Sequence, residues 1–210
     1  MSIDPRQRLG SCIRRHGTVA AYAVCGLVIG ALVMYLFLPA PAYSPEQMGD
    51  PYASSSAAYL EESLPVQLRI PAIDLDASFT DPLGLSENGE VEVPKGYEEV
   101  GWYKHGPTPG ELGPAVVLGH VDSVAGPAVF YSLGQLSLGD EIEIVREDGS
   151  IAVFEVTALE RYAQENFPTQ LVYGDIDHAG LRLVTCTGTF DRGVQRYSHN
   201  LVVYAALKDK

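Results

Sequence analysis

One segment near the C-terminal end of the sequence presents a cysteine in a position suited to chemistry. Residues 181–188, Leu-Arg-Leu-Val-Thr-Cys-Thr-Gly, alternate in a way that predicts a β-strand, and Thr187-Gly188 is predicted to end it. Cys186 would then lie at a strand end, where binding and catalytic groups are commonly found. A buried cysteine is more often a small hydrophobic residue. The position therefore makes a reactive thiol a hypothesis, with an inert, packed thiol as the alternative.

A second strand-like segment ends in a histidine in the same manner. A thiol acts as a nucleophile through its thiolate, which at neutral pH needs a base or a cation nearby. Residues 115–123 form a buried-type strand segment that ends in the motif Gly119-His120-Val121-Asp122-Ser123. We predict that His120 and Cys186 face a common cleft. Asp122 is predicted to orient the His120 loop by capping backbone donors, or to be a simple turn residue.

The remaining histidines outside the N-terminal region lack such a motif. His105, His178 and His199 fall in loop-like or strand-edge contexts and are predicted to be surface residues, with His199 near enough to Arg196 to border the cleft. The sequence contains no phosphate-binding loop, no Cys/His spacing typical of a metal site and no D-x-D-x-D-G calcium loop. No cofactor and no metal are therefore expected.

Composition divides the chain into four predicted parts: a cytoplasmic N-terminus (1–16), a transmembrane anchor (17–39), a flexible extracellular stalk (40–63) and one folded domain (64–210). Residues 18–38 carry no charge and are long enough to cross a bilayer as a helix. The arginines before them favour a cytoplasmic N-terminus with the domain outside the cell membrane. A cleaved signal peptide is the alternative, because Ala40-Pro41-Ala42 resembles a cleavage site.

Charge and cysteine content narrow the possible partners. The net charge is −13 and the first 16 residues are basic, so the rest of the chain is more acidic still. This disfavours nucleic acid, anionic headgroups and other anionic polymers as ligands. Cys12 and Cys25 belong to the predicted cytoplasmic and membrane parts, so Cys186 has no disulfide partner in the domain. An unpaired cysteine in an exported domain is a candidate reactive thiol.

The folded domain is predicted to be mostly β, with short helices at 129–136 and 170–173. Many short strands separated by Gly and Pro turns favour a closed or nearly closed barrel. Asp148-Gly149 predicts a tight hairpin, because this dipeptide tolerates the positive φ that such a turn needs. The predicted strands are 66–70, 73–79, 91–93, 115–121, 141–146, 151–159, 181–186 and 201–206.

These motifs resemble those of the sortases. The resemblance rests on Gly119-His120-Val121-Asp122-Ser123, on the strand Leu183-Val184-Thr185-Cys186 and on an arginine before the segment 200–205. The upstream segment 101–111, Gly-Trp-Tyr-x-x-Gly-Pro-x-Pro-Gly-Glu, resembles the actinobacterial branch called class F. The resemblance covers essentially all of residues 64–206, and the anchor and stalk are similar too. It implies an eight-stranded sortase-type β-barrel.

The resemblance also implies an activity and a site. A membrane-anchored cysteine transpeptidase would cleave an LPxTG-like sorting signal through a Cys186 thioester and pass the acyl group to an amine of a cell-wall cross-bridge or a pilin lysine. His120 would be the general acid and base, and an arginine would bind the oxyanion or the substrate backbone. Arg196 is preferred to Arg192 because it shares strand parity with Asn200. The supporting or substrate-binding residues are Asp122, Thr185, Thr187 and Asn200.

The sequence also departs from the family pattern and leaves other functions open. Thr187 follows the cysteine where a glycine is expected, and Arg182 replaces the threonine that opens the common TLxTC motif, which puts the substrate preference in doubt. The alternatives are a cysteine peptidase that gives its acyl-enzyme to water, and a catalytically silent binding domain displayed on a stalk. An L,D-transpeptidase is disfavoured because its Ser-His-Gly-Cys type segment is absent.

Overall fold

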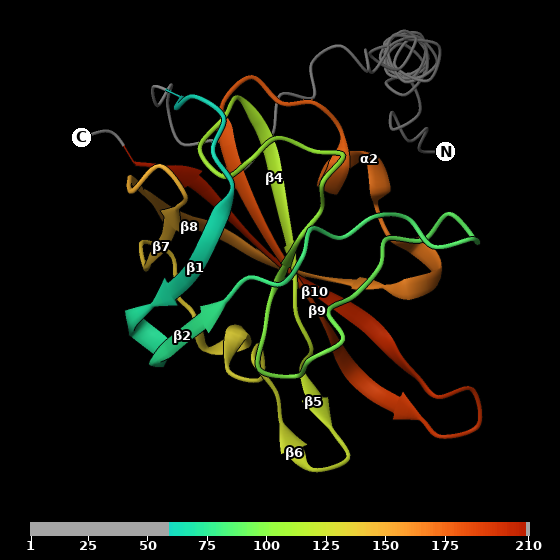
Figure 1. Cartoon of the computed structure of the whole chain (residues 1–210). Coiled ribbons are helices and arrows are strands. Elements are labelled where there is room, and N and C mark those ends of the chain that lie inside the picture. The colour runs from blue at the N-terminus through green and yellow to red at the C-terminus, as the bar shows by residue number, and fades with distance from the viewer. Residues whose placement is uncertain (1–58, 209–210) are drawn as a thin grey trace, which may run out of the picture. The chain divides into compact units, whose positions relative to one another are not determined.

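The computed structural model describes residues 59–208, which are mostly β (Figure 1). One sheet contains eight strands in the order β2-β1-β7-β8-β10-β9-β4-β3, and a separate hairpin pairs β5 with β6. The strands of the sheet are β1 (Pro65–Ile70), β2 (Leu75–Ser78), β3 (Gly101–Trp102), β4 (Gly113–Leu118), β7 (Glu141–Arg146), β8 (Ile151–Ala163), β9 (Ala179–Asp191) and β10 (Arg196–Leu207). The small hairpin consists of β5 (Asp122–Ser123) and β6 (Gly126–Pro127).

Helical structure in this part of the chain is short. The α-helix α2 spans Thr169–Tyr173, and three single 3-10 turns are η2 (Pro71–Ile73), η3 (Leu133–Gln135) and η4 (Gln164–Asn166). Because these helices are too short to bury a core by themselves, the sheet must supply it.

The sheet curls into a half-barrel. Isolated bridges connect the chain segments that flank its two edge strands, β2 and β3. Phe79, which follows β2, forms an isolated parallel bridge with Val100, which precedes β3. A second parallel bridge joins Leu83 to Tyr103. These bridges satisfy edge backbone groups that an open sheet would leave unpaired.

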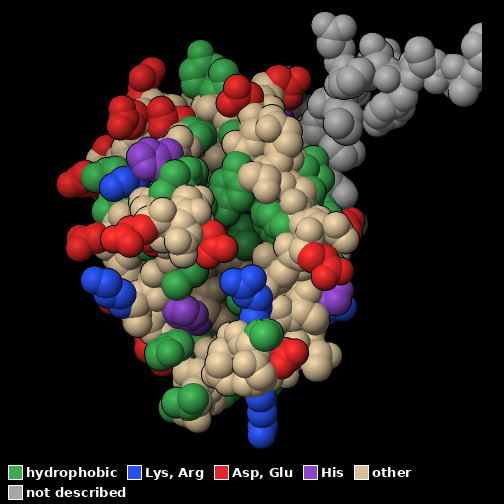
Figure 2. Space-filling model, turned by 90° about the vertical axis from the view of Figure 1, so that its right-hand side faces the viewer, with side chains coloured by type: hydrophobic (Ala, Val, Ile, Leu, Met, Phe, Trp, Pro, Cys, Tyr) green, Lys and Arg blue, Asp and Glu red, His purple; other side chains and the backbone are tan. Residues whose placement is uncertain are grey.

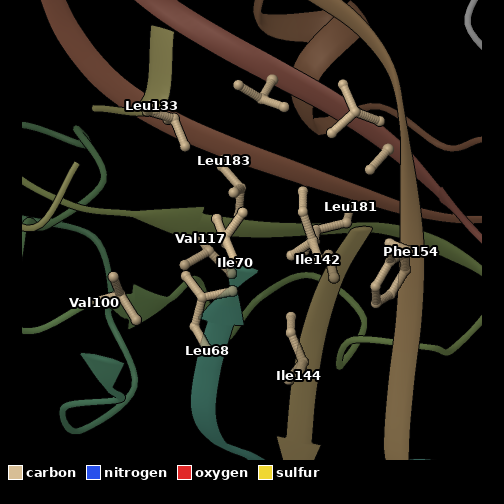
Figure 3. Close-up of a cluster of buried hydrophobic side chains, with 14 of the residues drawn as sticks. Leu68, Ile70, Val100, Val117, Leu133, Ile142, Ile144, Phe154, Leu181 and Leu183 are labelled. Atoms are coloured by element: carbon tan, nitrogen blue, oxygen red, sulfur yellow. The ribbon is translucent and has the colours of Figure 1, made fainter. Parts of the chain in front are cut away.

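The concave side of the sheet encloses the main hydrophobic core, to which most of the strands contribute. Figure 3 shows the side chains of Leu68 and Ile70 from β1 meeting those of Val117 from β4 and Leu183 from β9. All four are fully buried. This is the ordinary result of alternation, in which every second side chain of a strand faces the core.

Strands β4, β9 and β10 are buried on both faces. On the opposite face from the main core, Val116, Leu118, Val184, Val202 and Tyr204 form a second apolar cluster that packs against the α2 segment. Burial on both faces explains why these strands read as nearly continuous apolar runs in the sequence. The site described below lies where this second face comes to an end.

Several predicted elements are confirmed. Strand 141–146 coincides with β7, strand 66–70 with most of β1, and helix 170–173 with most of α2. The Asp148-Gly149 hairpin joins β7 to β8, and Gly149 has a φ of 82°.

Other predicted elements are wrong in their extent. The strand bearing the cysteine does not end at Gly188 but continues to Asp191, because its pairing with β10 resumes after a bulge at Phe190 and Asp191. Residues 91–93 form no strand, although Val91 makes an isolated bridge with Leu85. The predicted helix at 129–136 shrinks to the turn η3, and the strand predicted from residue 73 starts at Leu75, after η2.

The predicted membrane anchor (17–39) lies outside the described residues. Within residues 59–208, no helix is long and apolar enough to cross a membrane. Among the described residues, two that precede the boundary predicted at Leu64 already contact the folded domain: the Leu60 N–H donates to the Gly110 carbonyl at 2.7 Å, and the Ser63 N–H donates to Thr108 Oγ1 at 3.1 Å. Both partners belong to the turn that follows β3.

We expect the buried side chains of β9 to contribute strongly to the free energy of unfolding. Leu183→Ala removes a fully buried side chain and should lower the free energy of unfolding by about 2–5 kcal/mol. Leu138→Ala, at a leucine that is 70% exposed, is the matched control and should have little effect. Urea denaturation of the full chain, followed by fluorescence of its single tryptophan, the buried Trp102, measures both. Equal losses in the two variants would contradict this assignment of the core.

Candidate functional site

The parallel pairing of β4 with β9 brings the cysteine and the histidine to one level. Leu118 pairs with Val184, so two further residues along each strand set His120 beside Cys186. The pairing continues past β4, because the Gly119 N–H donates to the Val184 carbonyl at 3.2 Å. Thr185 Oγ1 also donates to the Gly119 carbonyl at 2.8 Å. Thr185 thus acts from the core side of β9 and fixes the backbone before His120.

The antiparallel pairing of β9 with β10 adds the polar residues on the other side of the cysteine. Asn200 lies directly opposite Cys186. Between the pairs Tyr197–Phe190 and His199–Thr187 the register shifts, with one extra residue in β9. Gly188 lies in this bulge with a φ of 88°, a conformation that favours glycine. A bulge bends the strand, and Arg196 lies beyond it at the start of β10.

The three residues expected to do chemistry line one open cavity of about 500 Å³. Its floor includes the buried Leu118 and Val184, which come from the second apolar face. Figure 2 shows a hollow with hydrophobic side chains at its floor, a basic side chain at its lower edge and acidic side chains around it. The lining residues are Gly89, Glu90, Val91, Val93, Leu118, Gly119, His120, Gln164, Phe167, Thr169, Tyr173, Val184, Thr185, Cys186, Arg196 and Asn200.

The His120 ring is held by a backbone acceptor and by an aromatic neighbour. Its Nε2 lies 2.7 Å from the Pro94 carbonyl oxygen, and its centroid lies 4.8 Å from that of Tyr97. Because a carbonyl only accepts, Nε2 carries a proton and Nδ1 is the acceptor nitrogen of the neutral ring. The ring can therefore take a proton at Nδ1 and return it, as a general acid and base must.

Cys186 is half-buried, and its surroundings favour the neutral thiol. Burial raises the pKa of the Cys186 thiol above its ordinary value, and the negative charge of Asp122 raises it further. The positive charge of Arg196 opposes both effects. The thiol therefore needs a base at the moment of reaction.

Asp122 makes a contact that the sequence does not predict. The sequence predicts that it caps backbone donors of the His120 loop or is a simple turn residue; in the structure Ser123 caps a donor there, because its Oγ accepts from the Ala125 N–H at 3.1 Å. Asp122 Oδ2 instead accepts a hydrogen bond of 2.5 Å from the Tyr197 hydroxyl of β10. This bond raises the pKa of Tyr197 to about 12. Tyr197 was not identified from the sequence, because the two residues are far apart in the chain.

The other residues singled out in the sequence lie at different distances from the cavity. Arg192 belongs to the exposed turn between β9 and β10, and of the two candidate arginines Arg196 lines the cavity. Thr187 lies opposite His199 and outside the lining. Arg182 is buried on the same face of β9 as Val184 but outside the lining, with its guanidinium carbon 4.7 Å from the centre of the Tyr204 ring.

The prediction that the other histidines are surface residues is partly wrong. His105 is exposed, but His178 is only 5% exposed and lies beside Asp177, with Nδ1 3.2 Å from Oδ1. His178 is buried because it directly precedes β9, where both faces are covered. His199 is half-buried and contacts Ser198 Oγ at 2.7 Å. None of these three lines the cavity.

Several lining residues had no sequence signal. Gln164 lines the cavity and donates to Asn200 Oδ1 at 3.3 Å. Phe167 and Tyr173 form an aromatic wall, with ring centres 6.4 Å apart. Val93 also lines the cavity, and its apolar side chain is 56% exposed, as is typical of a binding surface. Among residues 59–208, no three His, Cys, Asp or Glu side chains gather as a metal site requires.

Comparisons with known proteins agree on one family. Residues 68–208 match the family described as the sortase domain. Sortase A from Corynebacterium diphtheriae has a similar structure, with a TM-score of 0.53 and 23% identity over 71% of this chain and 63% of that chain. The D5 sortase transpeptidase of Clostridium perfringens gives a TM-score of 0.51 and 21% identity, over 69% and 78% of the chains. No curated protein sequence matches this chain.

A lid mutant of sortase C1 from Streptococcus agalactiae is similar to the same extent, with a TM-score of 0.51 and 19% identity over 73% of each chain. At these identities the likeness establishes the fold alone. The region shared with the diphtheria enzyme is less than two thirds of that protein's length.

The two candidate arginines can be separated by the reactivity of the thiol. Arg196→Gln should move the pH profile of Cys186 alkylation to higher pH, because the variant loses a positive charge that favours the thiolate. Arg192→Gln is the matched control and should leave the profile unchanged. The full chain is labelled with iodoacetamide at each pH, and mass spectrometry of the peptide that contains Cys186 gives the labelling rate. A shift in the control alone would assign the nearby charge to Arg192.

Proposed function

Because this chain belongs to the sortase family of cysteine transpeptidases, we propose that Cys186 takes an acyl group from a sorting-signal peptide and transfers it to an amine. The observation that carries the proposal is the convergence of Cys186, His120 and Arg196 on one cavity. The residues come from β9, from the loop after β4 and from β10, so the fold itself assembles them.

The cavity suits a short peptide of mixed character. Its floor is apolar, its aromatic wall comes from the α2 segment, and its polar groups gather around the cysteine. A volume of about 500 Å³ accommodates a few residues of a peptide. We propose an LPxTG-like sorting signal as the acyl donor, with its apolar residues on the floor and its threonine carbonyl at Cys186.

The first half of the reaction forms a thioester. The Cys186 thiol gives its proton to His120 Nδ1 as the sulfur attacks the threonine carbonyl carbon. The tetrahedral intermediate then collapses, the peptide C–N bond breaks, and the proton on His120 passes to the leaving amine. The raised pKa of the thiol makes this coupled proton transfer necessary, because little thiolate exists beforehand.

The second half releases the acyl group to the acceptor. An amine attacks the thioester carbonyl, His120 Nδ1 takes a proton from the attacking nitrogen, and the proton returns to sulfur as the C–S bond breaks. A new amide bond forms and the thiol is restored, so no oxidant or other co-reactant is consumed. The acceptor is an amine of a peptidoglycan cross-bridge or a pilin lysine.

Arg196 is proposed to stabilise the negative oxygen of each tetrahedral intermediate or to hold the substrate backbone. Its guanidinium presents a fixed fork of donors and stays charged throughout the cycle. Two facts support this role: Arg196 lines the cavity, and its charge already favours the thiolate of Cys186.

The N-terminal sequence supports a proposal for the setting of the enzyme. We propose that residues 17–39 anchor the chain in the cell membrane as a single pass, with the catalytic domain outside the cell. We also propose that the enzyme belongs to class F. The segment 101–111 supports this, and it folds into a compact turn in which Trp102 Nε1 donates to the Pro107 carbonyl at 2.8 Å.

Incubating the full chain with an LPxTG-like peptide and a primary amine tests the proposal. The wild type should yield the amide product and a trapped acyl group on Cys186, both visible by mass spectrometry. Cys186→Ala should abolish turnover, and His120→Gln should lower it by about 10²–10⁴-fold, the usual contribution of a general acid–base group. His105→Gln is the matched control at an exposed histidine.

The other outcomes are equally specific. Turnover that survives Cys186→Ala would exclude the thioester mechanism. A hydrolysed peptide that does not change when the amine is added would identify a cysteine peptidase. No acyl-enzyme with any sorting-signal peptide would favour the silent binding domain.

A further inference from the structure

The hydrogen bond between Tyr197 and Asp122 spans the candidate site from outside the cavity. Asp122 begins β5, two residues after His120, and Tyr197 follows Arg196 in β10. Their 2.5 Å contact therefore joins the loop that carries the histidine to the strand that carries the arginine. No strand pairing links β5 to β10 in the described sheets, so this side-chain bond adds a link that the backbone lacks.

Both ends of the bond are braced. The Tyr197 ring packs on Phe190, its partner across the β9–β10 hairpin, with ring centres 5.1 Å apart. Asp122 is held in the β5–β6 hairpin by its pairing with Pro127. Figure 1 shows that the tips of both hairpins extend away from the centre of the domain. A single hydrogen bond between two braced partners can set the distance between the His120 loop and strand β10.

The bond also fixes the position of a negative charge. Asp122 acts on Cys186 electrostatically in the direction opposite to Arg196. The groups around the thiol are His120 from the loop after β4, Asp122 from β5, Arg196 and Tyr197 from β10, Glu90 from the loop after β2 and Tyr173 from α2. Asp122 and Arg196 are the charged groups among them that act directly on the thiol.

We propose that Asp122 and Tyr197 form a positioning pair that sets the spacing of His120 and Arg196 around Cys186 and holds one negative charge beside the sulfur. The proposal rests on the transpeptidase function for its kinetic consequence, but the effect on the thiol can be measured without any substrate. Neither residue touches the reacting atoms.

Two substitutions separate the tether from the charge. Asp122→Asn removes the charge but leaves an amide oxygen that can still accept from the Tyr197 hydroxyl. Tyr197→Phe removes the hydrogen bond and leaves the charge. A fold-wide loss of structure would affect both variants alike, whereas the pair predicts different responses.

In the full chain, Asp122→Asn should move the pH profile of Cys186 alkylation to lower pH, because the thiolate no longer faces a like charge. Tyr197→Phe should not move the profile to lower pH, and it should reduce kcat/KM for the sorting-signal peptide by about tenfold, as expected for a lost hydrogen bond to a charged group. For the kinetic comparison Asp122→Ala is used, because it removes the acceptor of the hydrogen bond as well as the charge; combined with Tyr197→Phe, it should lose less in kcat/KM than the product of the two single losses, since the pair acts as a unit. Asp81→Asn and Tyr131→Phe, both at exposed residues, are the matched controls.

An unchanged profile in Asp122→Asn would overturn the charge placement, and a shift of both variants to lower pH would overturn the separation of charge from tether. Fully multiplicative kinetic losses would overturn the pairing. If no peptide were turned over, the proposed function would fail by itself, and the alkylation profiles would still decide the placement of the charge.

Discussion

The parallel pairing of β4 with β9 is the constraint on which the rest of the site depends. In a parallel pair, residues at the same level point to the same face, so the register that matches Leu118 with Val184 also aligns His120 with Cys186. Thr185 reinforces this alignment from the opposite face of β9 through the Gly119 carbonyl. A shift of one residue would turn the cysteine side chain away from the cavity and into the core.

Burial of this strand pair on both faces has two consequences. It makes the backbone around the cysteine rigid, because the main core and the second apolar cluster each pack against it. It also removes water from one side of the sulfur, which raises the pKa of the thiol. The same packing that positions the cysteine therefore keeps its thiol protonated. The catalysis that we propose for this site depends on groups at the cavity rim that move a proton or offset a charge.

The sequence was sufficient where the signal is local. Alternation predicted β7 and most of β1, and Asp148-Gly149 predicted its hairpin, because both patterns act over a few neighbouring residues. It failed where distant pairing decides the outcome. Thr187-Gly188 suggested a strand end, but β10 continues the pairing past a bulge that Gly188 makes possible. His178 appeared to be a loop residue, yet the covering of both faces of β9 buries it.

By itself, the sequence determined a mostly β domain and the two residue types, thiol and imidazole, at the ends of apolar segments. These follow from side-chain chemistry and short-range periodicity, which are properties of the chain before it folds. Only the tertiary structure decided that Arg196 lines the cavity while Arg192 lies in a turn, and that Asp122 binds Tyr197. These outcomes depend on strand register and on a single bulge, and register is set by the packing of the whole sheet.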